Sequence, residues 1–170
     1  MRFLAGIIVI LALAFAVSPV AAFEPWNVPH YPGSTVNAPM VARVASTGVM
    51  KWQAVDDTGW TTWSNEVARA LDNTSVDSES LARTLNGYLA SESRGSITIR
   101  QVQPGEAPDM VQYAVSAAFM EAKCGAAWAT ACVFLLNPIP VPAYYKSALM
   151  QTYQQRSRSG VIRHETFHAL

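Results

Sequence analysis

The feature that most constrains this sequence is segment 160–170, where His164, Glu165 and His168 form the pattern His-Glu-x-x-His. Residues four apart on a helix lie on one face about one turn apart, so a helix here brings both imidazoles to one ion. Glu165 lies to the side of that pair, where its carboxylate reaches a metal-bound water without becoming a ligand. Zinc lowers the pKa of such a water to about 7, and the glutamate accepts its proton during attack on a carbonyl. The pattern predicts zinc-dependent hydrolysis of peptide bonds.

The alternative is a structural helix that carries these polar residues for solubility or satisfies them by hydrogen bonds. Two of the chain's three histidines belong to the motif. The third, His30, has no metal-binding set around it. Apolar residues accompany the motif and favour a buried helix, as a catalytic helix in a protease core must be: Val161, Ile162, Phe167, Ala169 and Leu170.

The run 164–170, His-Glu-Thr-Phe-His-Ala-Leu, resembles the start of the metzincin signature H-E-x-x-H-x-x-G-x-x-H of matrixin-type zinc proteases. The resemblance implies that His164 and His168 are the first two ligands of a Zn²⁺ ion and that Glu165 is the general base. The thermolysin-like branch, with a glutamate ligand much farther downstream, starts with the same pattern and stays open as an alternative.

The resemblance also implies what should follow the motif. The signature's glycine, its third ligand and its Met-turn would all lie beyond Leu170. We therefore expect residues 49–170 to be the N-terminal part of a zinc metalloprotease catalytic domain whose C-terminal part is missing, and the chain as given to be inactive. Two residues depart from the family pattern: Thr166 replaces a usually apolar residue, and Arg163 places a charge before the first ligand.

The amino terminus has the three parts of a secretory signal. Arg2 precedes the apolar run 3–17, and small residues follow up to Ala22, which predicts a signal peptide over residues 1–22. An uncleaved anchor is the alternative, although Pro19 interrupts the apolar run. We expect a secreted or periplasmic protein with no membrane attachment after cleavage. Residues 23–48 are predicted to be an extended, proline-rich arm.

The charge balance limits the kinds of partner, and the cysteine content predicts a disulfide. Twelve basic and twelve acidic side chains give no net charge and no basic cluster that fits a nucleic acid, so the predicted partner is a polypeptide substrate. Cys124 and Cys132 are the only cysteines of a chain that is predicted to be exported, which predicts a disulfide between them; two buried free thiols are the alternative. Nothing in the sequence indicates an oligomeric state.

Hydrophobic periodicity and turn residues predict the remaining elements. The order of strand, helix and strand before the motif helix resembles the upper half of a metzincin domain. We therefore expect an α+β, zincin-like fold with a twisted mixed sheet packed on helices and the motif helix at the end of the chain. The predicted elements are strands 49–55 and 96–102, a buried strand 132–136, helices 60–71 and 81–89, a segment 109–122 that favours helix, an extended loop 137–142, and a helix 144–156 that Gly160 separates from the motif helix.

Two functions follow from these observations. The first is a secreted zinc-dependent endopeptidase of metzincin type. The second is a secreted binding or wall-associated module in which the motif is incidental or degenerate. The intact Glu165 favours catalysis over metal binding alone, and the zinc content of the protein distinguishes the two functions.

Overall fold

The computed structural model describes residues 38–73, 75, 77–135 and 138–170. The predicted signal peptide, His30 and most of the predicted arm lie outside these residues. Within them, no helix is long and apolar enough to cross a bilayer.

The described residues form a five-stranded mixed sheet in the order β2-β1-β3-β5-β4. β1 is parallel to β2 and β3, β3 is parallel to β5, and the short edge strand β4 is antiparallel to β5. The predicted α+β class with a mixed sheet is therefore confirmed. The strands are β1 (Val49–Asp56), β2 (Thr98–Gln101), β3 (Met110–Val115), β4 (Ala131–Val133) and β5 (Val141–Lys146).

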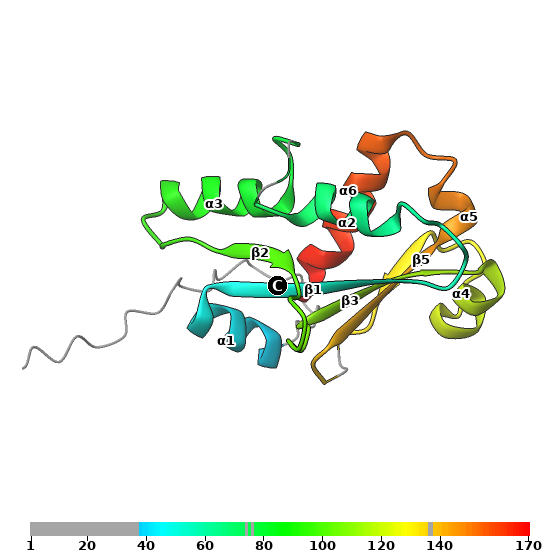
Figure 1. Cartoon of the computed structure of the whole chain (residues 1–170), viewed down its shortest axis with the longest axis horizontal. Coiled ribbons are helices and arrows are strands. Elements are labelled where there is room, and N and C mark those ends of the chain that lie inside the picture. Colours follow the sequence, from blue (N-terminus) through cyan, green and yellow to red (C-terminus); the bar gives the residue numbers. More distant parts are fainter. Residues whose placement is uncertain (1–37, 74, 76, 136–137) are drawn as a thin grey trace, which may run out of the picture.

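Helices lie on both sides of this sheet, and Figure 1 shows α2, α3 and α6 above it and α1 below it. The main core lies between the sheet and α2 and α6, where Trp52, Trp63 and Ile162 are fully buried. Among the described residues the helices are α1 (Ala38–Thr47), α2 (Trp63–Leu71), α3 (Leu81–Ser91), α4 (Ala117–Cys124), α5 (Ser147–Met150) and α6 (Gln155–Ala169).

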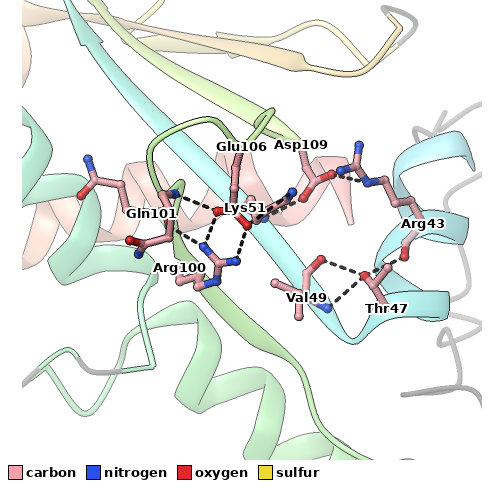
Figure 2. A network of polar contacts seen from close by, with 9 residues as sticks. Arg43, Thr47, Val49, Lys51, Arg100, Gln101, Glu106 and Asp109 are labelled. Carbon is pink, nitrogen blue, oxygen red and sulfur yellow. Dashed lines mark hydrogen bonds and ion pairs between the residues drawn. The ribbon is translucent and has the colours of Figure 1, made fainter.

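Helix α1 corrects the prediction of an extended arm through residue 48. Pro39 occupies the second position of this helix, where a missing N–H breaks no intrahelical bond. An ion pair then anchors α1 to the sheet: Arg43 Nε lies 2.9 Å from Oδ1 of the buried Asp109 (Figure 2). The second carboxylate oxygen of Asp109 accepts the N–H of Lys51, 2.7 Å away, so one side chain joins α1, β1 and the start of β3.

The segment 109–122 is not mainly helical as predicted. It forms strand β3, a turn at Ser116 and helix α4, which Ser116 caps by accepting the N–H of Phe119 at 3.2 Å. β3 is an inner strand of a sheet with helices on both sides, and nearly all of its residues are buried (Figure 1). A strand buried on both faces loses the polar–apolar alternation that identifies a strand.

The prediction for residues 138–156 was wrong in part. Residues 141–146 form β5, and of the expected long helix 144–156 only Ser147–Met150 and the first two residues of α6, Gln155 and Arg156, are helical. Pro142 suggested a loop because proline cannot donate to a sheet, yet its carbonyl accepts from Phe134 N at 3.1 Å. Gly160 does not separate two helices but lies within α6.

The strand predicted over 132–136 is a partly exposed edge strand and not a buried one. It begins at Ala131 and ends at Val133, and residue 136 lies outside the described residues. Because β4 contacts α6, the surface beside the motif helix includes an edge strand of the sheet.

Candidate metal centre

Helix α6 carries the complete His-Glu-x-x-His motif. Ile162, Thr166 and Ala169 are fully buried and turn one face of the helix towards the core. His164 and His168 lie on the opposite side and are exposed, while Glu165 is half-buried between the two faces. The helical spacing that the motif predicted is therefore present, with the imidazoles together and accessible.

The two imidazoles converge. Their Nε2 atoms lie 3.0 Å apart, and the rings meet edge to face with centroids 4.5 Å apart. Two nitrogens that bind one tetrahedral zinc at about 2.1 Å lie about 3.4 Å from each other, so the observed separation fits a shared ion after a small ring movement. The same separation also fits a hydrogen bond between two neutral rings, one donating through Nε2–H.

The surroundings of the motif influence its protonation states. Burial lowers the pKa of His168, and the neighbouring His164 lowers it further. This favours the neutral imidazole, the form that can ligate a metal. Burial raises the pKa of Glu165, and the charge of His164 opposes that rise. A carboxylate with a raised pKa is a stronger proton acceptor than an ordinary glutamate.

A solvent-open hollow of about 690 Å³ lies between α6 and the chain around β4, and His164 and Glu165 form part of its wall. Most of the other wall residues are small or apolar. Trp128, whose side chain is 86% exposed, stands at this hollow. The remaining lining residues are Cys124, Ala126, Ala129, Thr130, Ala131, Cys132, Ser157, Gly160 and Val161.

A disulfide between Cys124 and Cys132 closes the loop that forms one wall, as predicted. The loop is also bonded to the sheet, because Lys146 N donates to Thr130 O at 2.9 Å and Lys146 Nζ donates to the carbonyl of Ala127. Sequence reasoning did not identify Trp128 or this wall as part of the site. The position of Trp128 between Cys124 and Cys132 in the sequence was the signal that could have identified it.

Both departures from the family pattern have partners in the structure. Arg163 donates to the backbone carbonyl of Glu79 and pairs with its carboxylate at 3.4 Å, so its charge has a counter-ion. The hydroxyl of Thr166 accepts from Gln112 Nε2, 3.2 Å away, on the neighbouring strand β3. Gln112 and Glu79 were not predicted, because each lies far from the motif in the sequence.

A complete metal-ligand set is not present in residues 38–73, 75, 77–135 and 138–170, which contain no group of three or more His, Cys, Asp or Glu side chains able to hold an ion. The motif supplies two imidazoles and a carboxylate on one helix. Comparisons with protein-family models, with curated proteins and with solved structures found no match.

Proposed function

We propose that this protein is a secreted zinc-dependent endopeptidase of metzincin type. The observation that carries the proposal is the 3.0 Å separation of the His164 and His168 Nε2 atoms beside Glu165, with His164 and Glu165 at the wall of an open hollow. Two convergent imidazoles with an adjacent carboxylate are half of a catalytic zinc site, which needs a third protein ligand and leaves a position for water.

Each residue has a distinct role in the proposed reaction. His164 and His168 would hold the ion, which would supply Lewis-acid chemistry at the substrate carbonyl. Glu165 accepts a proton from the attacking water as the new C–O bond forms. It then delivers the proton to the peptide nitrogen as the C–N bond breaks. The raised pKa of Glu165 supports the first transfer, because it makes the carboxylate a stronger proton acceptor.

The neighbouring strand supports a polypeptide substrate. β4 lies at the edge of the sheet and pairs with β5 on one side only, from Ala131 opposite Tyr145 to Val133 opposite Ala143. An edge strand offers backbone donors and acceptors to an extended peptide. In zinc endopeptidases a strand near this position often forms the upper rim of the cleft. A substrate added to β4 would run along the hollow beside α6.

Export through a signal peptide over residues 1–22 belongs to the same proposal. The Cys124–Cys132 disulfide supports it, because disulfides persist in oxidising compartments outside the cytosol.

Metal analysis and a protease assay test the proposal on the protein as its source produces it. The expected result is about one zinc per chain and hydrolysis of an unfolded protein that a chelator abolishes and added zinc restores. A protein without zinc and without chelator-sensitive hydrolysis would instead fit the binding module with an incidental motif.

A further inference from the structure

Three buried polar side chains meet beneath the motif helix. Gln112 on β3, Tyr145 on β5 and Thr166 on α6 are all fully buried. Tyr145 donates its hydroxyl to Gln112 Oε1 at 2.6 Å, and Gln112 Nε2 donates to Thr166 Oγ1 at 3.2 Å. Thr166 also lies near the Tyr145 side chain, where it lowers the pKa of the phenol against the larger rise caused by burial. These three residues, the polar ring, are joined through Gln112, which is bonded to both of its partners.

The ring is rigidly supported. The backbone carbonyl of Gln112 accepts from Trp63 Nε1 at 2.9 Å, and the ring of Trp63 lies 5.1 Å from that of Tyr145. Trp63 belongs to α2, so two strands and a second helix hold the ring in place. Buried polar groups that are fully bonded favour one arrangement of a core, because any shift leaves a group unpaired.

The position of Thr166 connects this ring to the candidate metal centre. Thr166 lies between the two histidines in sequence, about 200° around the helix from each. Burial raises the pKa of the Tyr145 phenol, and the charge of Glu165, the neighbour of Thr166, raises it further. Rotation of α6 would therefore move the imidazoles and break the ring together.

Apolar contacts alone do not fix this rotation closely. Ile162 and Ala169 keep the inner face of α6 in the core, but a hydrophobic contact is non-directional and tolerates small turns of the helix. A ligand pair needs to be held within about 0.5 Å and 10–20°. Hydrogen bonds at buried sites supply that direction.

We infer that the Thr166–Gln112–Tyr145 ring sets the rotation of the motif helix, which makes these three residues positioning residues for the metal centre. The inference rests on the proposed function, and it gives a reason for a threonine where an apolar residue is usual. It also gives Thr166 a role beyond filling space in the core.

The test compares two small changes on the same buried face of α6. Thr166→Val removes the hydroxyl and keeps the shape, whereas Ile162→Val removes one methyl and leaves the ring intact. Zinc affinity is measured by competition with a chelator of known affinity, kcat and KM on an unfolded protein substrate, and thermal stability by the unfolding midpoint. The variants are made in the gene, and the protein is isolated as the cell produces it.

Thr166→Val is expected to weaken zinc binding roughly 3- to 10-fold, below or at the low end of the effect seen when a partner of a metal ligand is lost. It should lower kcat about 10-fold with KM changed less than two-fold, and Thr166→Ser should restore both. Ile162→Val should lower the unfolding midpoint and leave zinc affinity and kcat unchanged. Tyr145→Phe, which removes only a hydroxyl, should act like Thr166→Val and serves if the latter does not fold.

Two other outcomes would contradict these expectations. Zinc affinity and kcat in Thr166→Val and Tyr145→Phe that match those of Ile162→Val would overturn the positioning role while the proposed function stands. A wild-type protein that binds no zinc would overturn both.

Discussion

Arg158 of α6 lies 3.1 Å from Glu66 of α2, and the two side chains are only 18% and 14% exposed. The same guanidinium donates to the backbone carbonyl of Tyr153 and lies over the ring of Trp60 at 5.9 Å. Removing one partner of an ion pair that is mostly shielded from solvent leaves the other charge unpaired and destabilises the fold. The pair therefore fixes the amino-terminal half of the motif helix against α2.

Replacing one partner of this pair should destabilise the fold. Glu66→Gln removes the negative charge and leaves Arg158 largely buried without its counter-ion, at an expected cost of about 1–3 kcal/mol. Urea unfolding measures the change. The matched control is Arg156→Gln, because Arg156 pairs with Glu79 but its side chain is 82% exposed. Exposed pairs contribute about 0–1 kcal/mol, so equal losses in the two variants would contradict the argument from burial.

The disulfide wall of the hollow gives a second prediction. Cys124 and Cys132 are separated by eight positions. Opening so short a loop should lower stability by about 2–3 kcal/mol in the loop-entropy model. Thermal unfolding of the double variant Cys124→Ala, Cys132→Ala measures this loss, and reductant added to the wild type should reproduce it. A reductant effect that persists in the double variant would show that the bridge is not its cause.

Local signals in the sequence predicted part of this fold. The strand at residues 49–55 and the helix at 81–89 were predicted because one face of each is polar, and the motif helix because its spacing is helical. β3 and β5 were missed because strands buried on both sides carry no alternation, and Pro142 then pointed to a loop. Their identity depends on neighbours far along the chain.

The candidate site divides in the same way. His164, Glu165 and His168 could be predicted because five consecutive positions contain them. The ring partner Gln112 and the helix anchor Glu79 could not be predicted. Gln112 is separated from Thr166 by 54 positions in the sequence, and Glu79 from Arg163 by 84, so only the fold brings each pair together. Thr166 itself gave the available clue: a polar residue on the buried face of a helix requires a partner.

Acid should weaken the fold through Glu106. Arg100 donates two hydrogen bonds to Glu106, at 2.7 and 2.8 Å (Figure 2). Together with the N–H of Gln103, they lower the pKa of Glu106 to about 2. A carboxyl whose pKa is lower in the folded than in the unfolded state adds stability that is complete above the unfolded value. That contribution is lost as the pH falls from about 4.5 towards 2.

The acid limb of a urea-unfolding series against pH measures this contribution. Glu106→Gln should flatten the limb between those two pH values, and Arg100→Gln should flatten it as well because it removes the first cause of the shift. The double variant should add little to either change, since the two residues act as a pair. Single variants that keep the slope of the wild type would assign the acid sensitivity to other carboxyls.

Glu165 gives the prediction closest to the proposed chemistry. Glu165→Gln keeps the size of the side chain and removes its ability to accept a proton, while both imidazoles stay in place. Loss of a general base costs roughly 10² to 10⁴ in rate, so hydrolysis should fall by that factor with zinc still bound at wild-type stoichiometry. His164→Ala is the matched variant, because it removes a ligand from the same turn and should lose zinc and activity together. Hydrolysis by Glu165→Gln within a few-fold of wild type would remove the carboxylate from the reaction. Loss of zinc in that variant would make Glu165 a ligand instead of a base.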